Sequence, residues 1–397
     1  MAQPGVNIAI PRTVMALGFV SLFMDLSSEI IHALLPIFLT TTLGASVLVV
    51  GVIDGIAEAT ASISKIFSGY VSDRIGRRKP LILLGYGMAA LTKPLFAIAQ
   101  SAGVVLGARF ADRIGKGVRG AARDALVADV TPEEIRGRAF GLRQSMDTVG
   151  AFLGPLLAIG LMVLFQNDMR AVFWVAVIPA VISAMIVLIW VREPVDHGAQ
   201  AARPPLRLRE IGELEQAFWG VVGIGVVFTL ARFSEAFLIL KAKESGLPIA
   251  LAPLVLVAMN VIYSLGAYPA GILSDRISAK VLLRWGLLSL ILADALLAFG
   301  SGLLPIFAGI ALWGAHMALT QGLLAKLVAD RSPERLRGTA FGLFNLVSGV
   351  AMLIASVLAG VLWDSVGSSG TFIAGGAFGL LALGLSMIRS RSEKAYR

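Results

Sequence analysis

Cysteine is absent from the 397 residues, and charged residues are scarce. Without cysteine, disulfide bonds, thiolate metal sites and thiol redox chemistry are excluded. Asp, Glu, Lys and Arg make up 15% of the chain, whereas soluble proteins carry about 25%. Hydrophobic residues make up 57%, and most of them lie in apolar runs of about 20 residues, the length that spans a bilayer. The composition therefore predicts a bundle of membrane helices.

Signals for other classes of protein are also missing. A cleavable signal peptide is not expected, because the first apolar run continues into a full span. The pI of 10.1 does not indicate nucleic acid binding, since most of the excess Lys and Arg lies in short loops. The run GKGVRG at 115–120 lacks a preceding strand and does not fit a phosphate-binding loop. No nucleophile–base pair is visible, so neither an enzyme nor a cofactor is expected.

The same two loop motifs occur twice in the sequence, about 200 residues apart. GYVSDRIGRR at 69–78 returns as GILSDR at 271–276, and ADVTPEEIRGRAFGL at 128–142 returns as ADRSPERLRGTAFGL at 329–343. Asp73 maps to Asp275 and Asp129 maps to Asp330, with offsets of 202 and 201. Two nearly equal offsets indicate a duplicated half.

Twelve membrane spans can be drawn on the apolar runs. They lie at 13–40, 47–71, 80–100, 103–128, 139–164, 171–191, 217–240, 249–273, 280–300, 302–328, 339–363 and 370–388. Hydropathy alone would miss the fourth span, which is rich in charge, but the duplication requires a partner for the tenth. We expect a first bundle at 1–192, a linker at 193–216 and a second bundle at 217–397.

Basic residues alternate between the loops. One set of loops holds most of them, including Arg74, Arg77, Arg136 and Arg331, while the other set is nearly bare. The positive-inside rule places the basic set and both termini in the cytoplasm. We therefore expect a multi-pass protein of the cytoplasmic (inner) membrane of a bacterium.

Two six-helix halves joined by a linker resemble the major facilitator superfamily. The segment 69–78 fits that family's loop 2–3 signature G-x-x-x-D-R-x-G-R-R in full, and a degenerate copy follows at 271–276. The resemblance covers essentially the whole chain. It implies an all-α membrane protein with 12 transmembrane helices in two pseudo-symmetric six-helix bundles. It also implies that helices 1, 4, 7 and 10 line a central cavity.

The signature suggests a conformational latch between the halves. Gly69 permits close helix approach, and a carboxylate at Asp73 would favour the dipole of a neighbouring helix N-terminus. In the family that neighbour is helix 11. The alternative is that these residues only set topology and solvate a loop. The expected latch residues are Gly69, Asp73, Arg74, Arg77 and an acidic residue after helix 4, either Asp124 or Asp129.

Ionisable residues within the spans are concentrated in the first half. Charge at bilayer depth is costly, so these side chains need partners or a wet cavity. Helix 4 carries a basic stripe, and arginine grips carboxylate or phosphate with parallel bonds. Either the stripe pairs internally with acidic residues or it binds an anionic solute. The candidate substrate-binding residues are Arg109, Arg113, Lys116 and Arg119.

Acidic residues on helices 1, 2 and 7 are candidates for coupling. Asp25, Glu29 and His32 share one face of helix 1. They admit three interpretations: partners of the helix-4 arginines, a proton-coupling site, or weak candidates for metal ligands. The candidates for proton coupling or ion binding are Asp25, Glu29, His32, Asp54, Glu58 and Glu235, the last of which is first expected to pair with Arg232.

Helix 5 continues as Gly150-Ala-Phe-Leu-Gly154-Pro155. This run is similar to the superfamily's antiporter motif, in which small residues permit tight packing between the halves. Ordinary helix packing would explain the same glycines.

These observations predict a secondary active transporter that works by alternating access. We expect proton coupling and a small anionic solute or anionic metal chelate as substrate. The expected partners are the lipid bilayer, the solute and protons, with no nucleic acid and a monomeric chain. The alternatives are a multidrug/proton antiporter, which predicts an acidic and aromatic cavity, and a non-transporting sensor or scaffold on the same fold.

Overall fold

The computed structural model describes residues 9–75, 77–193, 211–333 and 336–395, and the regular structure in these ranges is helical. The first half contains α1 (Arg12–His32), α2 (Leu35–Ile37), η1 (Phe38–Thr42), α3 (Val47–Ile75), α4 (Lys79–Ile98), α5 (Ala102–Asp129), η2 (Glu133–Ile135), α6 (Arg136–Leu164) and α7 (Met169–Trp190). The second half contains α9 (Gln216–Ala231), α10 (Ala236–Glu244), η3 (Ile249–Leu251), α11 (Leu254–Arg276), α12 (Ala279–Phe299), α13 (Leu303–Asp330), α14 (Arg337–Val366) and α15 (Ser368–Ala395).

The helices coincide with the predicted spans. Ten of the described helical segments are long and apolar enough to cross a membrane, which confirms the all-helical membrane fold. The segment of α5 is not among the ten, as its charge predicted, and α15 contributes a shorter apolar stretch at 368–384. At 28 residues, α5 is about 42 Å long, which is enough to span the bilayer. Its charged residues Arg109, Asp112, Arg113 and Arg119 are buried against neighbouring helices.

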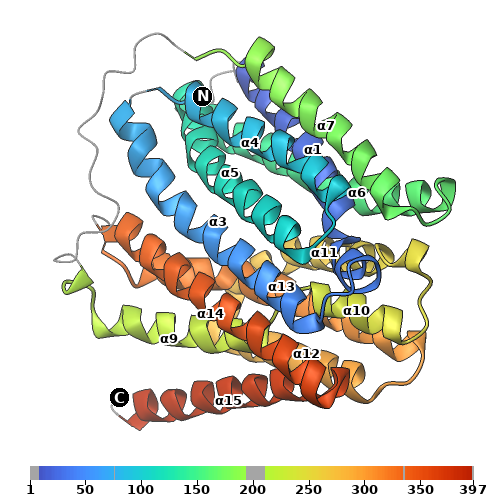
Figure 1. The fold of residues 1–397 in the computed structure, drawn as a ribbon. Coiled ribbons are helices and arrows are strands. Elements are labelled where there is room, and N and C mark those ends of the chain that lie inside the picture. Colours follow the sequence, from blue (N-terminus) through green and yellow to red (C-terminus); the bar gives the residue numbers. More distant parts are fainter. Residues whose placement is uncertain (1–8, 76, 194–210, 334–335, 396–397) are drawn as a thin grey trace.

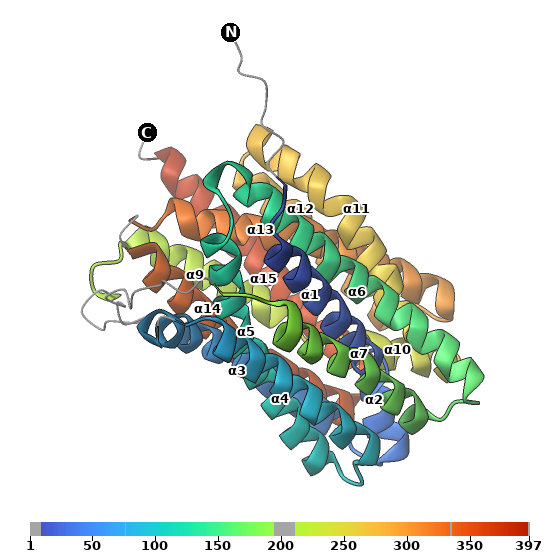
Figure 2. The ribbon, with the colours of Figure 1, turned by 90° about the horizontal axis from the view of Figure 1, so that it is seen from above.

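Helices of each half pack mainly against one another, and Figure 1 shows the first half above the second. Viewed from above in Figure 2, the helices of both halves run roughly along one common direction. We call the end of the bundle at which α7 stops and α9 begins the linker end, and the opposite end the far end. The linker itself, including 194–210, lies largely outside the described residues. Glu193, at its start, accepts hydrogen bonds from the amides of Arg78 and Lys79 and so caps α4.

Two spans are interrupted at corresponding positions. The first span breaks after His32, and Pro36 restarts it as α2 and η1. The seventh span breaks between α9 and α10, at residues 232–235. There the Ser234 hydroxyl accepts a hydrogen bond from the amide of Ala236, the first residue of α10, and so satisfies one backbone donor at the start of that helix. Broken helices of this kind place backbone polar groups inside membrane proteins only where protein or water can satisfy them.

The halves meet along two seams, of which the one between α3 and α14 is closely packed. A Cβ added at Gly51 would clash with the carbonyl oxygen of Ser356, and one added at Gly360 would lie 2.6 Å from the Cα of Leu48. Small residues thus bring the two backbones together. At the far end, the Asp364 carboxylate of α14 accepts hydrogen bonds from the amides of Val47 (3.1 Å) and Leu48 (2.9 Å), the first residues of α3.

Candidate functional site

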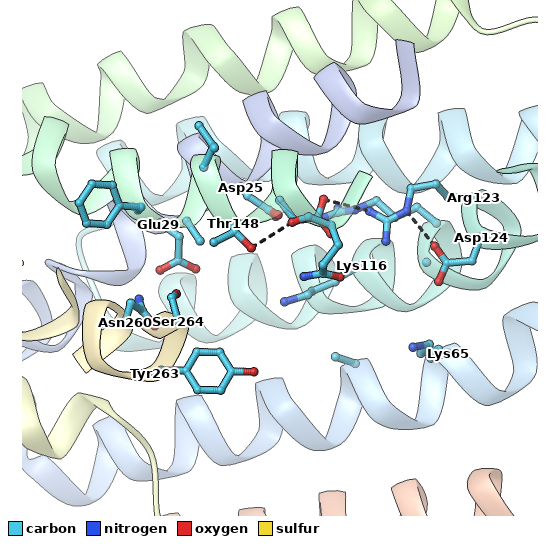
Figure 3. A pocket seen from close by; sticks show the side chains of 18 of the residues that line it. Asp25, Glu29, Lys65, Lys116, Arg123, Asp124, Thr148, Asn260, Tyr263 and Ser264 are labelled. Atoms are coloured by element: carbon cyan, nitrogen blue, oxygen red, sulfur yellow. Dashed lines mark hydrogen bonds and ion pairs between the residues drawn. The ribbon is translucent and has the colours of Figure 1, made fainter. Parts of the chain in front are cut away.

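A cavity of about 890 Å³ lies between the two halves, in the part of the bundle nearer the linker end. Helices α1, α3, α4, α5 and α6 form its charged wall, and α11 and α14 form the opposite wall (Figure 3). The side chains of Lys65, Lys116 and Gln144 in its lining are exposed, so water reaches them. Among the described residues, the second-half wall comes from helices 8 and 11, and the expected lining by helices 7 and 10 stays a prediction.

The lining carries equal numbers of acidic and basic residues, and all of them belong to the first half. The basic residues are Lys65, Lys116, Arg119 and Arg123, and the acidic residues are Asp25, Glu29, Asp124 and Asp147. The formal charge of the wall is therefore balanced before ion pairing is considered. Ion pairing decides which of these charges remain available to a solute.

One subset of the lining charges forms a closed network near the linker end. Arg123 contacts Asp124 at 3.2 Å and Asp147 at 3.9 Å, and Arg143 contacts the same two carboxylates at 3.7 Å and 2.6 Å. Arg123 also donates to the Ser21 hydroxyl at 2.7 Å. Two guanidinium groups thus neutralise two carboxylates, and together they tie α1, α5 and α6. Figure 3 shows the contact between Arg123 and Asp124.

A second subset has no such compensation. Among the described residues, Asp25, Lys65 and Lys116 make no ion pair or side-chain hydrogen bond. The guanidinium of Arg119 stacks over the ring of Tyr86, 4.6 Å from its centroid, and its Nη1 atom is buried without a hydrogen-bond partner. Three cations and one carboxylate around the cavity are therefore not engaged in a close ion pair among the described residues.

Arg109 and Arg113 are not among the described residues that line this cavity, so their expected role in substrate binding stays a prediction. Arg109 contacts Asp54 at 3.5 Å, and Arg113 contacts Glu58 at 3.6 Å. Both guanidinium groups are buried between α5 and α3, where an unpaired charge would be strongly destabilising. The internal-pairing alternative therefore describes this part of the stripe. A third pair, Lys93 with Asp112 at 3.0 Å, joins α4 to α5 in the same way.

Asp54 also connects the two halves. Its second carboxylate oxygen accepts a hydrogen bond of 2.7 Å from Ser234, in the break between α9 and α10. Asp54 is therefore a buried structural group in this conformation, held by Arg109 on one side and by the seventh span on the other. Glu58 is likewise engaged with Arg113.

The helix-1 triplet is only partly brought together. Glu29 lines the cavity and contacts His32 Nδ1 at 3.4 Å. Asp25 also lines the cavity but forms no ion pair or hydrogen bond with the side chain of Glu29 or His32. Among the described residues, no group of three or more His, Asp or Glu side chains is arranged to hold a metal ion, so the weak metal hypothesis for Asp25, Glu29 and His32 gains no support. The expected ion pair between Arg232 and Glu235 is also missing from the ion pairs of the described residues.

The expected latch is described only in part. The surroundings of Gly69 and the side chain of Asp73 lie outside the described part of the structure. Arg74 and Arg77 are exposed around the end of α3. Asp129 contacts Arg78, not Arg77, at 3.4 Å. Asp124 lies within α5 and belongs to the network with Arg123 and Arg143. Asp129, the last residue of α5, is the candidate latch carboxylate that meets the signature loop.

The glycines of the antiporter-like motif pack within the first half. A Cβ at Gly150 would lie 2.5 Å from the carbonyl oxygen of Leu22, and one at Gly154 would lie 2.6 Å from the Cβ of Glu29. Both neighbours belong to α1, so these glycines do not serve the interface between the halves in this conformation. They set how closely Asp25 and Glu29 approach α6.

The uncharged polar wall of the cavity was not predicted from the sequence. Asn260, Tyr263 and Ser264 of α11 and Asn345 of α14 face the charged wall across the cavity, and Figure 3 shows Asn260 and Ser264 opposite Glu29. A signal was present, since two amide side chains within otherwise apolar spans are unusual, but the predicted site rested on charged residues.

Comparison with known proteins identifies the family. The model of the Major Facilitator Superfamily matches residues 17–240 and again 217–396, one match for each half. The chain belongs to the major facilitator superfamily. Over 378 residues it is 30% identical to the uncharacterized MFS-type transporter MJ1317 of Methanocaldococcus jannaschii, covering 94% of this chain and 93% of that one.

Two further likenesses complete the comparison. The chain is 31% identical over 156 residues, 39% of its length and 38% of the relative's, to the multidrug resistance protein MdtH of Photorhabdus laumondii. Its fold is similar to the crystal structure of the nucleoside transporter NupG, with a TM-score of 0.80 at 13% identity, covering 95% and 98% of the two chains. This superfamily chain is thus a membrane transporter with the fold that the duplication predicted.

Proposed function

We propose that this superfamily member is a proton-coupled secondary transporter that carries a small organic anion across the cytoplasmic membrane of a bacterium. The observation that carries the proposal is the uncompensated positive charge of Lys65, Lys116 and Arg119 around the cavity. The proposal extends to the division at 1–192, 193–216 and 217–397, because alternating access needs two bodies that move against each other.

The orientation in the membrane follows from the loops. Those that hold Arg77, Arg78 and Arg136 lie at the linker end, and the positive-inside rule assigns such loops to the cytoplasm. The cavity lies nearer this end, whereas Asp364 joins α14 to α3 at the far end. These positions support an inward-facing state in which the cavity is open to the cytoplasm.

Charge balance supports an anionic solute. With Asp124 and Asp147 neutralised by Arg123 and Arg143, the remaining groups of the lining are three cations, the carboxylate of Asp25, and Glu29 beside His32. A carboxylate or phosphate on the solute would accept charge-assisted hydrogen bonds from Lys116 and Arg119. The amide and hydroxyl groups of Asn260 and Ser264 would bind its polar portion from the other half.

The same balance supports coupling to protons through Asp25. When Asp25 is ionised, it competes with the solute for Lys116. When it is protonated, the wall gains net positive charge and holds an anion more tightly. The proton and the anion therefore strengthen each other's binding. Such coupling favours symport, in which both are carried across the membrane in the same direction. Two acidic candidates remain. Glu29 contacts His32, and Glu235 lies in the break of the seventh span.

Binding can be tested with Lys116→Gln, which removes the charge and keeps the length of the side chain. We expect carboxylates or phosphates to raise the melting temperature of the purified wild-type protein, and affinity in the variant to fall about 10- to 100-fold, as for loss of a charge-assisted hydrogen bond. Arg136→Gln, at an exposed pair with Glu133, is the matched control and should retain binding. Stabilisation by hydrophobic cations alone would contradict the proposal.

Coupling can be tested with Asp25→Asn in proteoliposomes. An imposed pH gradient should drive accumulation of the anion by the wild type but not by the variant. Exchange of labelled for unlabelled anion should continue in the variant, because it does not require net proton movement. Glu133→Gln, far from the cavity wall, should behave as the wild type. Full gradient dependence in Asp25→Asn would assign the proton to another residue.

Multidrug efflux is a second candidate, favoured by the name of MdtH, to which part of the chain is similar. It predicts a cavity attractive to hydrophobic cations. The uncompensated Lys116 and Arg119 would repel such cations, which is why we place this function second. The panel of anions and hydrophobic cations described above separates the two candidates.

A further inference from the structure

Several side chains of α6 belong to the cavity and to the outer surface of the bundle at once. Val149, Phe152 and Leu153 line the cavity, and Val149 and Leu153 are 45% and 43% exposed. The apolar row continues along the same helix with Leu156 and Leu157, which are also exposed. Spacings of three and four residues place the row on one face of α6. An apolar track thus extends from the cavity along α6 toward the far end.

The facing helix, α11, carries a second apolar track, which extends from the cavity toward the linker end. Val261 and Leu265 line the cavity, and Leu265 is 71% exposed. Tyr268 and Ile272 extend this row along α11 and are exposed as well. The two tracks face each other where both line the cavity, at 149–153 of α6 and 261–265 of α11, so the gap is apolar on both sides there.

The gap exists because α6 and α11 meet only briefly. Helix α6 contacts α11 over a short stretch and also touches η3, which immediately precedes α11 and lies toward the far end. Nearer the linker end the two helices separate, and there the cavity lies between them. Both helices are long and apolar enough to cross a membrane, so the parts of these exposed apolar residues that face away from the cavity border lipid in a transporter.

We propose that the transported anion is an amphiphile with a single apolar chain, and that it passes between the bilayer and the cavity through the gap between α6 and α11. This inference rests on the proposed function and narrows its substrate class. The charged wall at Lys116 and Arg119 binds the anionic head, while the apolar tracks on α6 and α11 contact the chain. An anion without an apolar chain would contact the charged wall but not the apolar tracks.

The arrangement of charges and apolar residues favours this occupant over a neutral lipid or a fully water-soluble anion. A neutral lipid would leave the cations of the charged wall without a counterion. A water-soluble anion would bring polar groups against Phe152, Leu153 and Leu265. Only a molecule that is polar at one end and apolar along its length matches both surfaces, since burying apolar area is favourable and burying unpaired polar groups is not.

The test uses the full chain in phosphatidylcholine nanodiscs and dodecanoate with a photoreactive diazirine at its terminal carbon. We expect labelled peptides from 149–157 and 261–268. Unmodified dodecanoate should suppress labelling at least about tenfold more effectively than butanoate, because only the longer chain buries apolar area in the gap. Labelling spread evenly over lipid-facing helices, or equal competition by the two acids, would overturn the inference.

A double variant, Leu153→Trp with Leu265→Trp, fills the gap and should reduce this labelling about tenfold. Leu292→Trp is the matched control, because Leu292 is 56% exposed on α12 but does not line the cavity. Butanoate should still raise the melting temperature of the double variant, which shows that the protein is folded and that the head-group site is intact. Unchanged labelling in a folded double variant would contradict the route between α6 and α11.

The two proposals fail in different ways. If the anion site at Lys116 is wrong, neither acid protects against labelling and Lys116→Gln has no effect. If only the route is wrong, Lys116→Gln still weakens both acids, but butanoate competes as well as dodecanoate. The measurements therefore separate an error in the head-group site from an error in the chain's path.

Discussion

The two seams between the halves are built from opposite kinds of residue. Along the α3/α14 seam, glycines remove side chains at the contact, so that Gly51 and Gly360 allow the backbones to touch. Along the α6/α11 seam, large side chains such as Leu153 and Leu265 stand at the interface and remain exposed. Close packing needs small residues in a membrane, where helices gain no hydrophobic energy by leaving lipid. The first seam is therefore sealed, and the second stays open.

Helix α6 also contains glycines that would permit close packing against another helix. Gly150 and Gly154 could allow a close approach, but they face α1 and lock that helix to α6 within the first half. The face turned toward α11 carries bulky residues instead. The motif thus makes α1 and α6 one unit and leaves the α6/α11 seam free to open. If the proposed alternating access holds, the α3/α14 seam stays packed over most of its length while the α6/α11 seam, the gate, changes most.

The largest expected effect comes from breaking the sealed seam with Gly51→Val. The new side chain would clash with the backbone of Ser356, and the two helices would have to separate. We expect a loss of about 3 kcal/mol in the free energy of unfolding, at the upper end for overpacking, together with loss of transport. The measurement is the thermal melting of the purified protein.

Gly160→Val is the control for this substitution. Gly160 lies in α6, a helix of the same half, but a Cβ there meets nothing within 4 Å. Its melting temperature should remain within about 2–4 °C of the wild type. Equal destabilisation by both substitutions would mean that valine harms any helix of this protein and that the seam has no special role.

An intermediate effect is expected from Asp364→Ala, which removes the contact between α14 and the start of α3 at the far end. A helix cap contributes about 1–2 kcal/mol, and here that energy holds the halves together at one end only. The variant should therefore populate states open at the far end about tenfold more. Single cysteines introduced into this chain, which has none of its own, would report the change through their rates of labelling.

Asp168→Ala provides the matched control for the far-end contact. Asp168 accepts hydrogen bonds from the amides of Arg170 (2.9 Å) and Ala171 (3.3 Å) and so caps α7 within its own half. Its loss should lower stability by a similar amount without changing accessibility at the far end. An equal change in cysteine labelling in both variants would refute the role of Asp364 as a contact between the halves.

The fold was predictable from the sequence because its signals repeat. The duplicated loops located α5 as a span even though hydropathy alone does not. The breaks in the first and seventh spans were not predicted. Pro36 indicated a kink, but no local signal of that strength marks residues 232–235.

The candidate site was less predictable, since the sequence gives the face of a helix but not what that face meets. Arg113 and Lys116 lie three residues apart on α5, yet Arg113 is buried against Glu58 while Lys116 is exposed in the cavity. Their difference depends on how α3 packs beside α5. Asn260 and Ser264 were missed for a related reason, because their role arises only from facing the charged wall across the cavity.

The smallest expected effect compares one leucine from each seam. Leu353 of α14 packs against Gly55 of α3, since a Cβ at Gly55 would lie 2.8 Å from its Cδ1, whereas Leu265 of α11 stands in the open gap. Leu353→Ala should lower the free energy of unfolding by about 1 kcal/mol, and Leu265→Ala by less than about 0.5 kcal/mol. Thermal melting of both variants in the same detergent measures the difference. A larger loss for Leu265→Ala would show that α6 and α11 are packed together in the membrane, and the gate would then be a closed seam like its counterpart.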